Sequence, residues 1–436
     1  MTAGLIVAAP HSGAGKTTVT IGLMRALRRR GLAVQPFKCG PDYIDPAFHA
    51  VASGRPSFNL DTWAMSRMTL IDLATRHAGD IAIAEGVMGL FDSAGAAGQT
   101  ARGATADLAA VLGWPVVLVL DVWAQAETAA ATALGLARYR SDIAVAGVIL
   151  NRVAGPGHRA MIAPALDGVG LRLLGALGRD ARFELPERHL GLVQAGETED
   201  IERRLDALAD AVEEAVDLEA VQRAARPVRA TACAAPLVKP PGQRIALARD
   251  RAFSFMYPHV LAAWRAAGAE IVPFSPLADQ APDPSADAVW LPGGYPELHG
   301  AALAAAGSFH GGLRALAARA VPIHGECGGY MVLGQGIEDA EGRRHAMAGL
   351  LQVETSFRQR AMHLGYRRAR LLADSALGVA GSAVMGHEFH FCRVLRVGDE
   401  PLVDCRDARG DTVSEAGARR GTVSGTFFHF IDRQLA

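Results

Sequence analysis

The sequence predicts an α/β protein with two doubly wound domains, and three observations support this fold class. Over the first half of the chain, short runs that are apolar throughout alternate with helical patterns, as in a parallel sheet covered by helices on both faces. The alternation stops at a segment rich in proline and small residues, RPVRATACAAPLVKPPGQ, and then restarts. We therefore expect a first domain at 1–225, a linker at 226–243 and a second domain at 244–436.

The expected strands and helices alternate along both domains. Apolar runs that read as strands lie at 5–10, 33–38, 81–85, 115–121, 144–150, 244–249, 269–274, 287–292 and 321–325. Helical patterns cover 15–30, 104–112, 124–140 and 199–221, and the last has an apolar stripe on one face. From about residue 343 onwards the chain is richer in short strand-like runs and turns.

The composition limits the kinds of partner. Half of the 436 residues are hydrophobic and the formal net charge is −1, which argues against nucleic acid or a membrane surface as the main partner. The five cysteines are scattered without zinc or disulfide spacing, as in the reducing cytoplasm. The N-terminus lacks a basic leader and no apolar run approaches ~18 residues. We expect a cytoplasmic protein without a membrane span, and the sequence leaves open whether it forms a homodimer.

Lysine is rare in this chain and therefore informative. It occurs only at Lys16, Lys38 and Lys239, while arginine supplies the other basic residues. A compact ammonium group can do chemistry that a planar guanidinium cannot. Lys16 and Lys38 fall inside motifs, whereas Lys239 falls in the expected linker.

The stretch PHSGAGKTT, at Pro10–Thr18, resembles a phosphate-binding loop between a strand and a helix. It matches the pattern G-x-x-x-x-G-K-[ST], except that proline replaces the first glycine. Successive backbone N–H groups can still cradle phosphates at the start of the helix. The nucleotide would be held by Ser12, Gly13, Ala14, Gly15, Lys16, Thr17 and Thr18. Lys16 would reach the β- and γ-phosphates of ATP and Thr17 would hold Mg²⁺; the alternative is a glycine-rich turn with an accidental lysine.

A magnesium site also needs a carboxylate at the end of a neighbouring strand. Asp121 and Glu85 both end expected strands, and periodicity does not choose between them. A further loop, KCGPDYIDP, follows a strand and carries Lys38, Asp42 and Asp45. Ligands of open α/β sheets bind at this edge, although paired acids in a loop are also common in solvated turns.

A second motif, Gly325-Glu326-Cys327-Gly328-Gly329, has the form of a nucleophile elbow built around a thiol. Its glycines permit a tight turn, and the start of the following helix favours a thiolate. The N–H of Gly328 can stabilise an oxyanion, with further amides at Gly293 or Gly294 in LPGGYPE. The alternative is a buried structural cysteine.

A nucleophilic cysteine requires a histidine. The candidates are His387 and His390 in GHEFHF and His429 in GTFFHFID, and the sequence pattern does not rank them.

These motifs together resemble a known enzyme family over essentially the whole chain. PGGYPE, HGECGGYMVLG, GHEFHF and the late His429 look like the glutamine amidotransferase domain of enzymes that amidate cobyrinic and cobyric acids, a branch of class I amidotransferases. PHSGAGKTT, KCGPDYIDP and EGVMGLFD are similar to dethiobiotin-synthetase-like P-loop domains. The combination resembles the a,c-diamide synthases of cobyrinic and hydrogenobyrinic acid. The resemblance implies that the second domain has a flavodoxin-like class I amidotransferase fold.

The resemblance also implies roles for residues of the thiol site. Cys327 matches the nucleophile of the family and His429 the histidine that activates it, with Gly294 and Gly328 as oxyanion donors. Many class I amidotransferases carry a glutamate two residues after this histidine. Ile431 occupies that position here, so the resemblance implies a Cys–His pair.

In the first domain, the resemblance favours Glu85 over Asp121 as the metal carboxylate. Thr17, Asp45 and Glu85 would hold Mg²⁺, and Lys38 and Asp42 would contact the substrate. Asp42, Asp45 and Asp92 fall where the family places acids that hold the metal or help to activate the substrate carboxylate.

The implied reaction is amidation of the a and c carboxylates of hydrogenobyrinic acid, with ATP, Mg²⁺ and glutamine, in cobalamin biosynthesis. One alternative is the same reaction on cobalt-containing cobyrinic acid; the Arg-rich composition leans weakly toward the cobalt-free macrocycle. A cobyric acid synthase is disfavoured by the compact length. An alternative from another class is a P-loop partition or scaffold ATPase, in which Cys327 would have no role.

Overall fold

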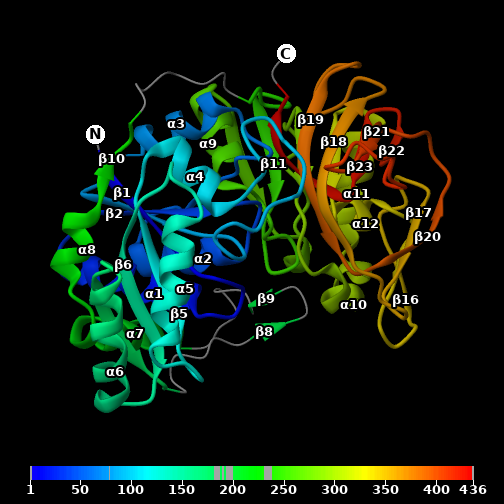
Figure 1. The fold of residues 1–436 in the computed structure, drawn as a ribbon. Helices are drawn as coiled ribbons and strands as arrows, with labels where there is room; N and C mark the ends of the chain where they lie inside the picture. Colours follow the sequence, from blue (N-terminus) through cyan, green and yellow to red (C-terminus); the bar gives the residue numbers. More distant parts are fainter. Residues whose placement is uncertain are drawn as a thin grey trace. The chain divides into compact units, whose positions relative to one another are not determined.

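The computed structural model describes residues 2–77, 79–180, 187–188, 191–192, 200–229 and 238–434. The chain divides into two compact units, Met1–Ala235 and Pro236–Ala436. Both are built on parallel sheets flanked by helices, which confirms the α/β class that the sequence predicts (Figure 1).

The first unit is built on one sheet with the strand order β3-β2-β4-β1-β5-β6-β7, all parallel, and with β10 antiparallel beside β1. The strands are β1 (Ala3–Ala8), β2 (Val34–Cys39), β3 (Phe58–Leu60), β4 (Ile81–Glu85), β5 (Val116–Asp121), β6 (Val145–Val153), β7 (Leu173–Gly178) and β10 (Arg226–Pro227). A further short pair, β8 (Glu187–Arg188) and β9 (Gly191–Leu192), is antiparallel. The central strands are buried along nearly their whole length, which explains their continuous apolar sequences.

Helices connect these strands. They are α1 (Lys16–Arg29), α2 (Asp45–Ser53), α3 (Arg67–Arg76), α4 (Thr105–Leu112), α5 (Thr128–Arg138), α6 (Pro156–Gly168), α7 (Ile201–Ala215) and α8 (Leu218–Ala224). α7 lays an apolar stripe that includes Leu205, Leu208 and Val212 against the unit, where it packs on α1.

Two boundaries differ from the sequence expectation. The helix expected at 199–221 is two helices, because Val216 is extended and the Asp217 carboxylate accepts a hydrogen bond from the Ala220 N–H (2.8 Å), which starts α8. Arg226 and Pro227 pair with β1 and so belong to the first unit rather than to the expected linker.

The second unit has a main sheet with the order β12-β11-β13-β14-β23-β22, in which all but β22 run parallel. Its first five strands follow the flavodoxin-like order 2-1-3-4-5. They are β11 (Arg244–Ala248), β12 (Glu270–Phe274), β13 (Ala288–Leu291), β14 (Ile323–Glu326), β22 (Ala418–Arg420) and β23 (Val423–Thr426). Helical segments are α9 (Pro258–Ala266), η3 (Pro276–Ala278), η4 (Pro296–His299), α10 (Gly300–Ala305), α11 (Gly307–Ala318) and α12 (Gly328–Leu333).

Two four-stranded sheets, with the orders β16-β15-β17-β20 and β21-β18-β19-β24, complete the second unit. Their strands are β15 (Gly336–Glu338), β16 (Arg344–Ala346), β17 (Val353–Ser356), β18 (His363–Leu371), β19 (Ala383–His390), β20 (Arg393–Val397), β21 (Val403–Arg406) and β24 (Phe428–Arg433). Most of the strands expected beyond residue 343 therefore form separate sheets, whereas β22 and β23 join the doubly wound one.

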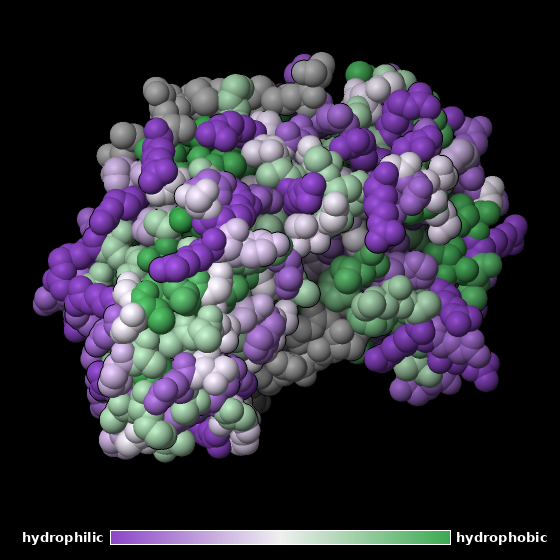
Figure 2. Space-filling view, viewed as in Figure 1, coloured by the Kyte–Doolittle hydropathy of each residue, from purple (hydrophilic) through white to green (hydrophobic). Residues whose placement is uncertain are grey.

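The surface mixes polar and apolar side chains. Hydrophilic residues cover much of the viewed face, with apolar ones between them (Figure 2). Among the described residues, no helix combines the length and hydropathy that a membrane span requires.

Candidate active sites

The loop after β1 has the geometry of a phosphate cradle. Gly13 and Gly15 have φ values of 80° and 93°, a left-handed conformation that favours glycine. A Cβ atom at Gly15 would lie 2.1 Å from Nδ2 of Asn151, which itself donates a hydrogen bond to the Ala14 carbonyl (3.0 Å). The loop runs into α1 at Lys16, so the N–H groups of the first helical turn point towards it.

The register of the sheet places the end of β4 beside the ends of β1 and β2. β4 lies between β1 and β2, and Glu85 is paired with Val7 on one side and with Lys38 on the other. The loop that follows β1 therefore meets Glu85 and Lys38 at the same sheet edge, where open α/β sheets bind their ligands.

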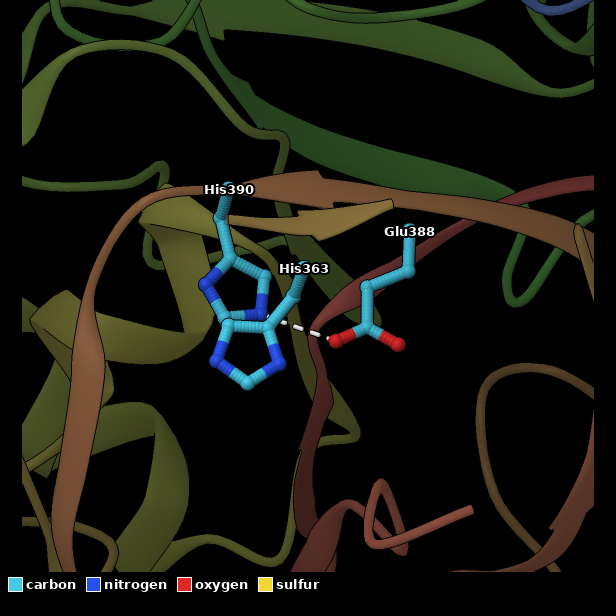
Figure 3. A group of neighbouring side chains, drawn as sticks. All are labelled: His363, Glu388 and His390. Carbon is cyan, nitrogen blue, oxygen red and sulfur yellow. Dashed lines mark hydrogen bonds and ion pairs between the residues drawn. The ribbon is translucent and has the colours of Figure 1, made fainter. Parts of the chain in front are cut away.

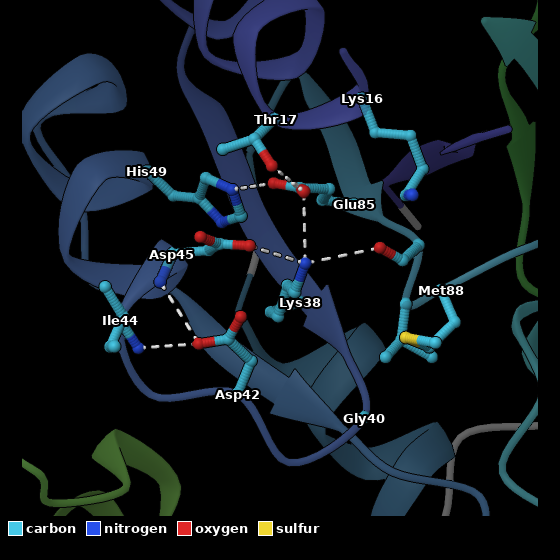
Figure 4. A network of polar contacts seen from close by, with 12 residues as sticks. Lys16, Thr17, Lys38, Gly40, Asp42, Ile44, Asp45, His49, Glu85 and Met88 are labelled. Carbon is cyan, nitrogen blue, oxygen red and sulfur yellow. Dashed lines mark hydrogen bonds and ion pairs between the residues drawn. The ribbon is translucent and has the colours of Figure 1, made fainter. Parts of the chain in front are cut away.

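Glu85 is the centre of a buried polar cluster (Figure 4). Its Oε1 accepts hydrogen bonds from the Thr17 hydroxyl (2.6 Å) and from Lys38 Nζ (3.0 Å), and its Oε2 lies 2.6 Å from His49 Nε2. Lys38 Nζ also donates to Asp45 Oδ2 (2.7 Å). The structure thus joins four of the predicted residues and adds His49.

Glu85 and Asp121, the two candidate metal carboxylates, make different contacts in the structure. Glu85 contacts Thr17, whereas Asp121 binds Arg152 Nη1 at 2.5 Å and accepts a hydrogen bond from the Trp123 N–H at 2.9 Å. Asp121 is therefore occupied by structural contacts of its own.

The charges of the cluster follow from its contacts. Burial disfavours charge on Lys38, but the carboxylates of Asp45 and Glu85 outweigh burial and raise its pKa. Burial likewise acts against the Glu85 carboxylate, but Lys38 and the His49 hydrogen bond lower its pKa. Burial and the neighbouring Asp42 raise the pKa of Asp45 well above its usual range. Lys38 and Glu85 are thus an ion pair, with Asp45 the acid most ready to hold a proton.

The donor set suits a hard divalent cation. Thr17 supplies a hydroxyl oxygen and Glu85 and Asp45 supply carboxylate oxygens, all at the edge of the phosphate loop. These are the ligand types that Mg²⁺ prefers beside nucleotide phosphates.

Asp42 and Asp92 stand around this cluster. Asp42 Oδ1 accepts hydrogen bonds from the N–H groups of Ile44 (2.7 Å) and Asp45 (3.3 Å), which shapes the start of α2. Asp92 Oδ2 accepts one from the Gly89 N–H (2.7 Å). Burial, followed by Lys38, lowers the pKa of Lys16, and Asp92 is among the weaker opposing influences. Asp92 therefore acts on Lys16 through its charge.

The turn between β14 and α12 is a strained elbow. Cys327 has φ 46° and ψ −104°, outside the regions that non-glycine residues usually adopt. A Cβ atom at Gly329 would lie 2.0 Å from the Leu291 carbonyl oxygen, and one at Gly325 would lie 2.6 Å from the carbonyl carbon of Gly329. The glycines of the motif are thus required by close backbone packing.

The structure brings together the predicted residues of the thiol site. Gly293 lies close to both His429 and Cys327. A Cβ atom built on Gly293 would be 3.1 Å from His429 Nε2 and 3.2 Å from Cys327 Cβ, so the two side chains lie beside the same glycine. A Cβ atom at Gly328 would lie 3.1 Å from the Gly294 nitrogen, which places these two backbone segments side by side. The chain passes directly from β23, which pairs with β14, into β24, which carries His429.

Burial sets the resting protonation of this site. It raises the pKa of the Cys327 thiol, with a further contribution from Glu297. It lowers the pKa of His429 to about 3. At neutral pH the resting pair is therefore a thiol and a neutral imidazole.

This protonation predicts slow alkylation of Cys327 in the resting protein. Because a thiol with a raised pKa gains thiolate only as the pH rises, labelling by iodoacetamide should grow by about tenfold per pH unit between about pH 7 and pH 9. Peptide mass spectrometry at each pH would measure the rate. A rate that levels off by about pH 9 would show a thiol of ordinary or lowered pKa instead.

The other two candidate histidines, His387 and His390, lie on β19. Figure 3 shows His390 with its neighbours His363 and Glu388. His387 is opposite His429 in the β19–β24 register and helps to lower its pKa. His390 Nε2 lies 2.9 Å from Glu388 Oε1, and its Nδ1 lies 3.1 Å from Cys392 Sγ. His390 is therefore part of a second polar network.

This network also has three ligand-type residues close together. The ligand atoms of His363, Glu388 and His390 lie within 4.8 Å of one another. The two imidazoles, however, are stacked with ring centres 4.6 Å apart and planes 10° apart, so their in-plane lone pairs do not converge. Arg367 Nε binds the same carboxylate at 2.6 Å. The arrangement is that of a hydrogen-bonded core network rather than a metal centre.

Comparison with known proteins names the class that this fold and these sites define. Residues 5–193 match the family model of a CobQ/CobB/MinD/ParA nucleotide binding domain, and residues 244–434 match that of a CobB/CobQ-like glutamine amidotransferase domain. The chain thus joins a P-loop nucleotide-binding unit to a glutamine amidotransferase unit.

Curated relatives match nearly the whole chain. A protein of Rhodobacter capsulatus is 59% identical over 429 residues, which cover 98% of both chains. Proteins of Mesorhizobium japonicum and Agrobacterium fabrum are 55% and 52% identical, covering 99% and 98% of both chains, respectively. All three are named hydrogenobyrinate a,c-diamide synthase. The chain belongs to the hydrogenobyrinate a,c-diamide synthase family, as the sequence motifs predicted.

Proposed function

We propose that this protein converts the a and c carboxylates of hydrogenobyrinic acid to amides, with ATP as the activating substrate and glutamine as the nitrogen donor. The observation that carries the proposal is the presence, in one chain, of a phosphate loop with a buried Lys38–Glu85–Asp45 cluster and of a strained Cys327 elbow facing His429. Its relatives of that name match both units. The four described free thiols fit an enzyme of the cytoplasm.

In the second unit, Cys327 would release ammonia from glutamine. His429 accepts the thiol proton as sulfur attacks the side-chain carbonyl carbon, and the N–H groups of Gly294 and Gly328 would stabilise the oxyanion. The C–N bond breaks, the proton passes from His429 to the leaving nitrogen, and ammonia departs. Water then hydrolyses the thioester to glutamate.

In the first unit, the phosphate loop and Lys16 would hold ATP while a substrate carboxylate attacks the γ-phosphate and displaces ADP, which gives an acyl phosphate. Thr17, Asp45 and Glu85 would hold Mg²⁺, which neutralises phosphate charge when bound. Lys38 and Asp42 would position the carboxylate. Ammonia then displaces phosphate from the acyl phosphate and leaves an amide, and it must arrive unprotonated to act as a nucleophile.

The names of the relatives favour the cobalt-free macrocycle over cobyrinic acid. The test offers both macrocycles in competition to the purified protein, with ATP, Mg²⁺ and glutamine, and follows the products by mass spectrometry. We expect the diamide of hydrogenobyrinic acid to accumulate first. Preferential amidation of the cobalt-containing macrocycle would reassign the substrate, and no amide from either would contradict the proposed function.

A further inference from the structure

The thiol site has no carboxylate at the position where many class I amidotransferases carry one. Ile431, two residues after His429, is fully buried, and its carbonyl oxygen lies 2.8 Å from His259 Nε2. A catalytic imidazole is usually oriented by a third group, which also stabilises the imidazolium that forms during proton transfer. The question is which group serves His429.

Glu326 lies where such a group is needed. It is the last residue of β14, directly before Cys327, and only 2% of it is exposed. Its Oε1 accepts a hydrogen bond from the Phe430 N–H (2.8 Å), and its Oε2 lies 3.9 Å from His429 Nδ1. Glu326 and Cys327 are therefore adjacent in sequence at the elbow, and His429 on β24 lies near both.

The contact with His429 is longer than a hydrogen bond. Catalytic hydrogen bonds are often long in the free enzyme and shorten when substrate binds. A backbone hydrogen bond at Phe255 also acts on His429 and raises its pKa in part, so Glu326 would share the orientation of the ring.

A buried carboxyl group is unfavourable for folding unless its charge or its hydrogen bonds are used. Burial raises the pKa of Glu326 to about 8, against the hydrogen bond from Phe430. A carboxyl group with this pKa is partly ionised near neutral pH. Its ionised form is favoured when His429 is protonated, because opposite charges stabilise each other. This behaviour suits a partner that responds to proton transfer.

We propose that Glu326 is the positioning carboxylate of the glutamine site and takes the place of the acid that is absent at Ile431. In its ionised form it accepts a hydrogen bond from Nδ1–H of His429 while Nε2 takes the Cys327 proton, and it stabilises the imidazolium until the proton on Nε2 passes to the leaving ammonia. The inference rests on the proposed glutamine chemistry, but it concerns only the hydrolysis of glutamine in the second unit.

The second unit offers a matched control. Glu415 is also buried, burial also raises its pKa to about 8, and its Oε1 accepts a hydrogen bond from the Phe427 N–H at 2.7 Å. It differs from Glu326 in that the described contacts of its carboxylate do not include His429. Glu415→Gln therefore removes an equivalent buried carboxyl group from the same part of the chain.

The experiment measures glutamate release from glutamine by the full-length protein, a readout that does not need the macrocycle. We expect Glu326→Gln to lower kcat by about 10- to 100-fold with little change in KM, because losing a positioning group removes only part of the about 10²- to 10⁴-fold that positioned proton transfer contributes. Glu415→Gln should remain within a few-fold of the unchanged protein. Ammonia-dependent amidation should be unaffected in both variants.

Several outcomes would overturn the inference. They are an unchanged kcat in Glu326→Gln, a rise in KM as large as the fall in kcat, or an equal loss in Glu415→Gln. If Glu326→Gln does not fold, Glu326→Asp decides, because it keeps the carboxyl group but withdraws it by one methylene. A lower kcat at constant KM supports the inference and an unchanged kcat refutes it. Failure to amidate either macrocycle would instead count against the proposed function.

Discussion

Replacing Cys327 with alanine should abolish glutamine-dependent amidation and leave ammonia-dependent amidation close to that of the unchanged protein. The proposed nucleophile is the thiol on the strained elbow, which lies beside Gly293 together with His429. Removing a catalytic nucleophile costs at least about 10³-fold in kcat. The phosphate loop and the Glu85 cluster belong to the other unit, so free ammonia should still be used. Product mass with each nitrogen source measures the effect.

Cys392→Ala is the matched control for this prediction. Cys392 is also a buried thiol close to an imidazole, with 3.1 Å between its sulfur and His390 Nδ1, but it does not lie on the elbow. It should retain glutamine-dependent activity within a few-fold. Loss of both nitrogen sources in Cys327→Ala would contradict the division of labour between the two units. Full glutamine use in that variant would exclude Cys327 as the nucleophile.

The features that could be predicted from sequence are those set by local backbone constraints. The phosphate loop and the elbow both place glycines where the backbone is left-handed or closely packed, so their spacing alone indicates strand, turn and helix. The fold class followed for a similar reason, because strands buried on both faces are apolar throughout. Val216 shows the limit: a continuous helical pattern did not reveal that the chain becomes extended there.

The contacts that sequence could not predict are those made across strands. Glu85 and Asp121 both end buried strands, and only the register of β4 between β1 and β2 places Glu85 beside Lys38. His49 was missed, although it lies four residues after Asp45 on α2 and therefore on the same helix face. Glu326 was read as part of the elbow, because its distance to His429 depends on how β24 follows β23.

Replacing Glu85 with glutamine should reduce amidation with both nitrogen sources by about 10²-fold or more. In the resting protein, the carboxylate binds Thr17, Lys38 and His49 together, and contacts with Lys38 and His49 keep it ionised. Glutamine keeps the shape but cannot supply the negative charge that a divalent cation needs beside the phosphates. Breaking a buried ion pair also costs about 3–5 kcal/mol of stability, so Tm must be measured beside the rates.

Asp121→Asn separates the metal role from a general effect of removing a carboxylate at this sheet edge. Asp121 ends β5, which is separated from β4 by β1, and it binds Arg152, so its loss should change the rates by only a few-fold. Titrating Mg²⁺ at fixed ATP should show a weakened metal dependence in Glu85→Gln and an unchanged one in Asp121→Asn. The reverse pattern would make Asp121 the metal carboxylate. A normal Mg²⁺ dependence in Glu85→Gln with a low rate would assign Glu85 to the positioning of Lys38 instead.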